Sequence, residues 1–174
     1  MGGTSAGLAV LGEFIFAALN GTVYSSEALD NPYDYRVTIE TDFLLIPVMR
    51  RIITDSHFAQ RDRMGRLIVF LARILQDGWA TGVRGIGIDE GTALLVELDG
   101  WVQLAGRGAA YFLLADHQPE VCQPAVPLTF TLVPVYKIQS GGFFNLLTWQ
   151  GNGGVAYYLS VDNGQLSSSL GTIY

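Results

Sequence analysis

Hydrophobic residues recur at intervals of three or four in two stretches of the chain, which is the spacing of a helix with an apolar face. The first stretch runs from Leu8 to Leu19 and ends at Asn20-Gly21, a common helix stop. The second runs from Arg63 to Gln76 and has Gly78 just past its end. The pattern predicts a helix near the N-terminus that is apolar on nearly all sides, and an amphipathic helix in the middle of the chain.

Most other apolar segments are short and bounded by glycines or polar turns, which is typical of β-strands. The strands are expected at residues 48–54, 85–89, 93–98, 101–105, 128–136, 143–149 and 155–161. Asp99-Gly100 predicts a hairpin turn, and the polar, acidic residues 22–42 predict a long surface loop. Helices near the front and strands behind favour a layered α/β fold with a strand-rich C-terminal part.

The composition indicates one domain, residues 1–174, with a hydrophobic core. Of the 174 residues 49% are hydrophobic, and the 21 glycines indicate many turns. A formal charge of −6 disfavours nucleic acid as a partner, because phosphate binding requires a basic face. A single cysteine, Cys122, excludes an internal disulfide, and the scattered His57 and His117 are too few for a metal cluster. We therefore expect no metal and no cofactor.

Two membrane-related features are missing from the pattern. No uninterrupted apolar run reaches the roughly 18 residues that a membrane helix needs, and no basic region precedes the first apolar stretch. We therefore expect neither a membrane partner nor a signal peptide in this sequence. This absence does not decide between export and retention, and the location is left unknown with the cytoplasm favoured.

The first residues carry a candidate nucleophile. Gly3-Thr4-Ser5-Ala6-Gly7 has the G-x-S-x-G pattern of a nucleophile elbow, a sharp turn from strand to helix that exposes the serine hydroxyl. The alternative is an ordinary tight turn before a buried helix. A strand that feeds such a turn needs about five residues, and only three residues precede Thr4. We therefore expect an upstream segment, a companion chain or a second copy to complete the catalytic unit.

Ser5 needs a base that accepts its proton, and histidine is the usual choice. His57 lies between a predicted strand and a predicted helix, whereas His117 lies in what resembles an exposed loop. A carboxylate that orients the imidazole is expected from Glu90 at the mouth of a strand. Its neighbour Asp89 is a rival for this role, and periodicity does not choose between the two residues.

Three segments in this order resemble the cyanophycinases, a family of serine peptidases: GGTSAG at residues 2–7, the pattern D-x-H-F-x-x-R-x-R-x-G-R-L at 55–67, and GIGIDE-x-TA at 85–93. The resemblance implies a flavodoxin-like three-layer sandwich related to class I glutamine amidotransferases, here without its N-terminal strands. It also implies exopeptidase cleavage of cyanophycin, a poly-aspartate that carries arginine on each side chain, into β-aspartyl-arginine dipeptides.

The same resemblance assigns roles to particular positions. It makes Ser5 the nucleophile, His57 the general base and Glu90 the orienting acid, and the amide of Ala6 would serve as one oxyanion donor. Substrate-binding positions are implied at Asp55, Ser56, Arg61, Arg63 and Arg66. Arginine forks suit aspartyl carboxylates, and a carboxylate suits a substrate guanidinium. For the arginines, the alternative is an ordinary cationic helix face.

The chain departs from the family pattern just before the histidine, where members commonly have glutamine and this chain has Ser56. Recognition of the polymer side chain therefore remains open. Two other functions also stay open: an aspartyl dipeptidase of the same broad family, which the arginines after His57 disfavour, and a noncatalytic remnant or interaction subunit.

Overall fold

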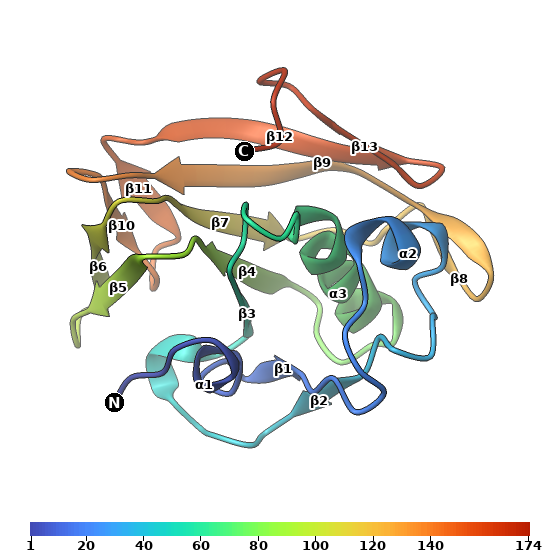
Figure 1. Cartoon of the computed structure of the whole chain (residues 1–174), viewed down its shortest axis with the longest axis horizontal. Coiled ribbons are helices and arrows are strands. Elements are labelled where there is room, and N and C mark those ends of the chain that lie inside the picture. Colours follow the sequence, from blue (N-terminus) through green and yellow to red (C-terminus); the bar gives the residue numbers. More distant parts are fainter.

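The computed structural model describes residues 1–174 and has an α/β fold built on one large mixed sheet (Figure 1). The sheet has nine strands in the order β13-β12-β9-β7-β4-β3-β1-β2, with β8 beside β9. These strands are β1 (Phe14–Phe16), β2 (Ile39–Thr41), β3 (Ile52–Ser56), β4 (Val83–Ile88), β7 (Ala110–Ala115), β8 (Val121–Gln123), β9 (Val126–Ile138), β12 (Val155–Asp162) and β13 (Gln165–Ser168). The α/β class with a strand-rich second half is thereby confirmed.

Three neighbouring strands, β1, β3 and β4, run parallel, and every other pair in the sheet is antiparallel. In the β3–β4 pair, Asp55 lies opposite Gly87 and Ser56 lies opposite Ile88. The two strands therefore end at the same edge of the sheet. In open α/β sheets, the carboxyl ends of parallel strands are where ligands usually bind.

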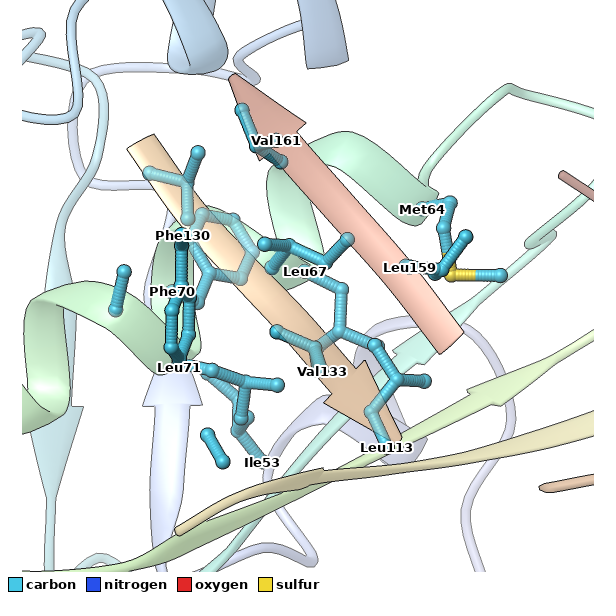
Figure 2. Packing of buried hydrophobic residues seen from close by; sticks show 14 of the residues in the cluster. Ile53, Met64, Leu67, Phe70, Leu71, Leu113, Phe130, Val133, Leu159 and Val161 are labelled. Carbon is cyan, nitrogen blue, oxygen red and sulfur yellow. The ribbon is translucent and has the colours of Figure 1, made fainter. Parts of the chain in front are cut away.

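One face of the sheet is covered by α2 (Ser25–Asp30) and α3 (Met64–Gln76). Eleven of the thirteen residues of α3 are buried, because the helix lies between the sheet and α2. Figure 2 shows Leu67, Phe70 and Leu71 of this helix packed among side chains of the sheet. This is the larger of the two hydrophobic cores and holds α3 in a fixed position.

The other face is covered by a second sheet with the strand order β11-β10-β6-β5. Its strands are β5 (Thr92–Val96), β6 (Trp101–Gly106), β10 (Phe143–Asn145) and β11 (Gln150–Asn152). Phe112 of the large sheet stacks on Phe144 of the small one, with ring centroids 3.8 Å apart. Near the N-terminus, α1 (Ala6–Ala9) and the 3-10 helix η1 (Pro47–Met49) also lie on this side. The layers are compatible with a flavodoxin-like sandwich.

The predicted helix over Leu8–Leu19 is wrong. Helix α1 ends at Ala9 and has no buried residue, and the chain then enters β1. Gly12 is the point of close approach, since a Cβ there would lie 2.6 Å from the Ile52 carbonyl oxygen. The apolar residues Phe14–Phe16, whose spacing also fits a helix, instead form the short strand β1.

The predicted loop over residues 22–42 is also wrong, because it contains α2 and β2. The Glu27 carboxylate accepts a hydrogen bond from the Tyr24 amide (3.0 Å) and so caps the start of α2. Strand β2 forms because it pairs with β1, with Ile39 opposite Phe16. Tertiary pairing thus orders a segment whose composition alone resembles a loop.

The amphipathic helix at Arg63–Gln76 and the hairpin at Asp99-Gly100 are confirmed, as α3 and the β5–β6 turn. The strand expected at 48–54 begins only at Ile52, after η1, and the strand expected at 143–149 ends at Asn145. The Asn145 side-chain oxygen accepts hydrogen bonds from the amides of Leu147 and Thr148, and so turns the chain. The other predicted strands appear with shifted ends. No helix here has the length and apolarity to cross a membrane.

Candidate active site

Three side chains from distant parts of the chain meet at the carboxyl ends of β3 and β4. The Ser5 Oγ lies 3.1 Å from the Nε2 atom of His57, and the Nδ1 atom of His57 lies 2.7 Å from the Oε1 atom of Glu90. Ser5 precedes α1, His57 follows β3, and Glu90 follows β4. The hydroxyl, imidazole and carboxylate therefore form one hydrogen-bonded row, the geometry that nucleophilic catalysis by serine requires.

Ser5 has the strained backbone that a nucleophile elbow predicts. Its φ is 53° and its ψ is −120°, a combination that non-glycine residues rarely adopt. The turn is so tight that a Cβ on Gly3 would lie 2.0 Å from the Gly7 carbonyl oxygen, whereas a Cβ on Gly7 would meet nothing. The first glycine of the G-x-S-x-G pattern is thus required by sterics.

The amide of Ala6 is free to donate. The next amides along the chain are used internally: Gly7 donates to the Thr4 carbonyl, and Leu8 donates to the Ser5 carbonyl. No hydrogen bond from the Ala6 amide is found, and Ala6 lines the pocket beside Ser5. The chain therefore offers one backbone donor next to the nucleophile.

The loop after β3 holds His57 in place. His57 has a positive φ of 50°, and its carbonyl accepts a hydrogen bond from the Arg61 amide (3.0 Å). Phe58, which is fully buried, inserts beside β4 where Gly87 leaves room, since a Cβ on Gly87 would lie 2.5 Å from the Phe58 ring. The packing of Phe58 against Gly87 therefore fixes the loop that carries His57, a contact that sequence reasoning missed.

The structure distinguishes the two carboxylates that sequence left as rivals. Asp89 is buried and accepts hydrogen bonds from the amides of Ala59 (2.9 Å) and Ala109 (3.0 Å). Glu90 alone contacts His57, and its own amide donates to the Gln60 side chain (2.9 Å). Asp89 therefore ties the histidine loop to the sheet, whereas Glu90 faces the imidazole.

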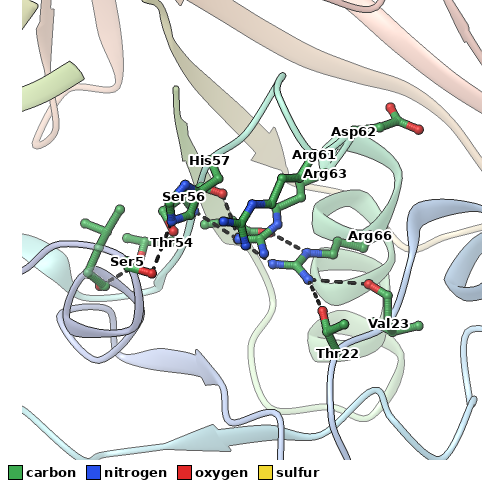
Figure 3. Close-up of polar contacts among 12 residues, drawn as sticks. Ser5, Thr22, Val23, Thr54, Ser56, His57, Arg61, Asp62, Arg63 and Arg66 are labelled. Carbon is green, nitrogen blue, oxygen red and sulfur yellow. Dashed lines mark hydrogen bonds and ion pairs between the residues drawn. The ribbon is translucent and has the colours of Figure 1, made fainter. Parts of the chain in front are cut away.

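Two of the five residues implied for substrate binding are bound to each other. The guanidinium of Arg66 donates to both carboxylate oxygens of Asp55, at 2.7 and 2.6 Å, and both side chains are buried. Figure 3 shows Arg66 reaching from α3 toward Thr22 and Val23. Arg66 is therefore not part of a solvated cationic helix face, because it joins α3, β3 and the loop after residue 21.

Arg63 is also anchored, but it reaches the pocket. Its guanidinium donates to Asp55 (3.1 Å) and to the Ser56 carbonyl (2.8 Å). Burial lowers the pKa of Arg63, and the nearby Asp55 carboxylate opposes that shift. Arg61 differs, since its side chain is 55% exposed and its Nε atom lies 3.8 Å from Glu90. Arg61 thus pairs with the carboxylate of the hydrogen-bonded row, whereas Arg63 and Arg66 pair with Asp55.

A pocket of about 760 Å³ opens beside Ser5. Its walls come from α1, the β1 region, β2 and the ends of β3 and α3. The polar and charged lining residues are Ser5, Thr22, Glu40, Thr41, Asp42, Thr54, Asp55, Ser56, Arg63 and Arg66. Glu40 and Asp42 were missed as candidates because their segment resembled a loop, and only pairing with β1 brings it to the pocket.

The remaining histidine lies elsewhere. His117 follows β7, which runs antiparallel to β4, and it therefore lies toward the opposite edge of the sheet. It hydrogen-bonds with Asp116 (2.9 Å) and the Thr131 carbonyl (2.9 Å), and the bond to Asp116 raises the pKa of His117. No group of three or more His, Cys, Asp or Glu side chains is arranged to hold a metal ion.

Comparison with known proteins identifies relatives of the chain. It is 33% identical over 150 residues to proteins named cyanophycinase from Trichormus variabilis and Nostoc sp., a match that covers 84% of this chain and 45% of each relative. A cyanophycinase from Synechococcus elongatus is 36% identical over 109 residues, 63% of this chain and 29% of the relative. No protein-family model matches. The chain thus spans about half the length of the curated relatives it matches.

Proposed function

The chain is related to the cyanophycinases, and we propose that it carries the catalytic residues of a serine-type exopeptidase that hydrolyses cyanophycin to β-aspartyl-arginine dipeptides. The observation that carries the proposal is the row Ser5–His57–Glu90, with contacts of 3.1 and 2.7 Å. The positive φ of Ser5 and the free amide of Ala6 support it. A noncatalytic remnant has no reason to retain a strained serine backbone together with this alignment.

The geometry supports a two-step acyl transfer. The Ser5 Oγ attacks the scissile carbonyl carbon while the Nε2 atom of His57 accepts the hydroxyl proton, and the Ala6 amide donates to the developing oxyanion. The imidazolium then gives its proton to the leaving amine, which leaves an acyl-enzyme. Water, deprotonated by His57, releases the acyl group and restores the Ser5 hydroxyl. Glu90 holds the imidazole and stabilises its charged form throughout.

The pocket offers groups of both signs for a zwitterionic substrate. Arg63 has guanidinium donors left after its bonds to Asp55 and the Ser56 carbonyl, and these suit a substrate carboxylate. Across the pocket, Glu40 and Asp42 form no ion pair within the chain and suit a guanidinium. Asp55 is different, because Arg63 and Arg66 already occupy its carboxylate. Its role in this proposal is to support the pocket.

The proposal includes a further structural contribution beside β3. Strand β1 pairs with β3 at a single position, Phe14 opposite Ile53. Elsewhere on that side, α1 and Gly12 pack against β3 in place of a paired strand, and the Thr54 hydroxyl donates to the Leu8 carbonyl (2.8 Å). We expect an upstream segment, a companion chain or a second copy to supply the strand that leads into the Ser5 turn and a second oxyanion donor.

The test combines labelling of the serine with analysis of products. A fluorophosphonate probe is expected to label the wild-type chain and the exposed-site control Ser26→Ala, but not Ser5→Ala, because only an activated serine reacts. Cyanophycin should yield β-aspartyl-arginine, with turnover rising when the upstream segment is supplied. Equal labelling of Ser5→Ala and wild type would refute the serine mechanism. Release of free aspartate from small dipeptides alone would favour the dipeptidase.

A further inference from the structure

A second pocket, of about 370 Å³, lies at the edge of the sheet opposite to Ser5, His57 and Glu90. Arg51 immediately precedes β3, and Arg84 lies near the start of β4, opposite Ile52. His57 and Glu90 follow the other ends of these strands, on the order of 15–20 Å away. This pocket is therefore separate from the site described above, and the inference drawn from it does not rest on the proposed function.

The pocket gathers arginines that no carboxylate neutralises. The chain has nine arginines, and five of them form ion pairs: Arg36, Arg61, Arg63, Arg66 and Arg73. Of the other four, Arg50, Arg51 and Arg84 all line this pocket. The carboxylate of Glu13 lies nearby, but it accepts the backbone amide of Arg51 (2.6 Å) and pairs with none of the three guanidinium groups. In a chain of net charge −6 such a concentration of positive charge requires an explanation.

The guanidinium group of Arg84 and the backbone of Arg51 are held in place before any ligand binds. The Arg84 guanidinium stacks over the Trp149 ring at 4.8 Å and donates through one nitrogen to the Leu146 carbonyl (2.9 Å), which leaves its other N–H groups unpaired. Arg51 has a positive φ of 56°, and its carbonyl accepts the Arg84 amide (2.8 Å). Burial and the charge of Arg51 both lower the pKa of Arg84, so an anion here would relieve an unfavourable charge. Prepositioned guanidinium forks suit oxyanions.

We propose that this pocket binds a small oxyanion, a phosphate or carboxylate group, between the guanidinium groups of Arg50, Arg51 and Arg84. Its volume lies within the usual range of small-ligand sites. The apolar Val48 and Leu147 also line the pocket.

Calorimetric titration of the 174-residue chain with pyrophosphate and, separately, with succinate at constant ionic strength tests the proposal. Arg84→Gln and Arg51→Gly should each weaken binding about ten-fold or more. Because glycine adopts the positive φ of position 51 without strain, a loss of affinity in Arg51→Gly does not come from a folding defect. The matched control is Arg107→Gln, which removes the same charge outside the pocket and should bind like the wild type.

Binding of either probe supports the site, and the probe that binds identifies the group as phosphate or carboxylate. The proposal is overturned if the wild type binds neither probe, or if Arg107→Gln weakens binding as much as Arg84→Gln does. The second result would show that net charge, rather than this pocket, attracts the anion.

Discussion

Glu90 faces His57 and Asp89 does not, because successive residues at the end of a strand point in opposite directions. Asp89 turns inward and joins two backbone amides, while Glu90 turns outward to the imidazole. Glu90 is half-exposed, at 49%, so in the proposed mechanism its removal is expected to be less damaging than removal of a buried triad acid.

Glu90→Gln should lower kcat about 100-fold, because an amide still accepts a hydrogen bond but no longer stabilises the imidazolium. Asp89→Asn should behave differently and lower the free energy of unfolding by about 1–3 kcal/mol, since one of its two amide bonds is weakened in a buried site. Steady-state kinetics on cyanophycin and urea denaturation, applied to both variants, separate the two roles. Equal loss of kcat in both would contradict this division.

The Asp55–Arg66 ion pair is enclosed between α3, β3 and the loop after residue 21, where the Arg66 side chain is only 5% exposed. A buried charge that loses its partner is costly, whereas the loss of a more exposed helix pair is not. The pair therefore supports the wall of the pocket on which Arg63 and Ser56 lie.

Asp55→Asn should destabilise the chain by about 3–5 kcal/mol, because it leaves the Arg66 guanidinium buried and unneutralised. The matched control is Asp77→Asn, which breaks the more exposed Arg73–Asp77 pair and should cost about 1 kcal/mol or less. Thermal and chemical unfolding of the two variants provides the comparison. A cost for Asp55→Asn no greater than that of its control would show that the pair is not a structural anchor.

Strand β4 contributes to the site through two glycines, which have no side chains. Two glycines, Gly85 and Gly87, lie on the same face of the strand, and both leave room for side chains of the larger core. Next to Gly87 lies the Phe58 ring, which follows His57 directly; next to Gly85 lie Leu67 and Leu71 of α3. The first contact is therefore coupled to the imidazole, and the second to helix packing.

Gly87→Ala should reduce kcat/KM about ten-fold or more, because its Cβ would lie 2.5 Å from the Phe58 ring and displace the histidine loop. Gly85→Ala is the matched variant: its Cβ would lie 3.2 Å from a flexible leucine and should leave kcat/KM of the folded fraction nearly unchanged. Kinetics normalised to titrated active serine provide the measurement. Unchanged turnover in Gly87→Ala would contradict the positioning role of Phe58.

The last residue of the chain supports the loop that carries His57. Ser5 lies near the N-terminus, and the last residue, Tyr174, returns to the start of α3, where its hydroxyl accepts the Met64 amide (3.0 Å) and donates to Asp62 (2.9 Å). The Tyr174 ring also packs edge-on against Phe58. Burial raises the pKa of Tyr174 far above its usual value, so the hydroxyl keeps the proton that it donates.

Tyr174→Phe should lower stability by about 1–3 kcal/mol, because it leaves the Met64 amide and the Asp62 carboxylate without this partner. A smaller loss of kcat/KM should accompany it, since the ring that supports Phe58 is retained. Tyr158→Phe is the matched control, because its side chain is exposed and makes no hydrogen bond. Hydrogen exchange at the Met64 amide measures the loss of its bond to the Tyr174 hydroxyl. An unchanged exchange rate in Tyr174→Phe would contradict a stabilising role for this bond.

Folding of the whole molecule also creates features that no local pattern predicts. Strand β7 lies in the middle of the large sheet, yet it was missed, because a strand buried on both faces reads as a continuous apolar run without alternation. The helix expected over Leu8–Leu19 failed for a related reason: apolar residues on all sides fit a buried strand as well as a helix. By contrast, α3 was predicted correctly, since its 3.6-residue period is long and unambiguous.

The sequence by itself determined which reactive and charged groups the chain carries. These are a serine in a glycine-rich turn, a histidine after a strand, two adjacent acids and a set of arginines. Spacing within one segment reports local conformation, and the elbow and α3 are local. Tertiary structure alone decided that Glu90 contacts His57, that Arg66 belongs to Asp55, and that Glu40 and Asp42 reach the pocket. Those outcomes depend on the register of β3 with β4 and of β1 with β2, which is set by packing between residues far apart in the chain.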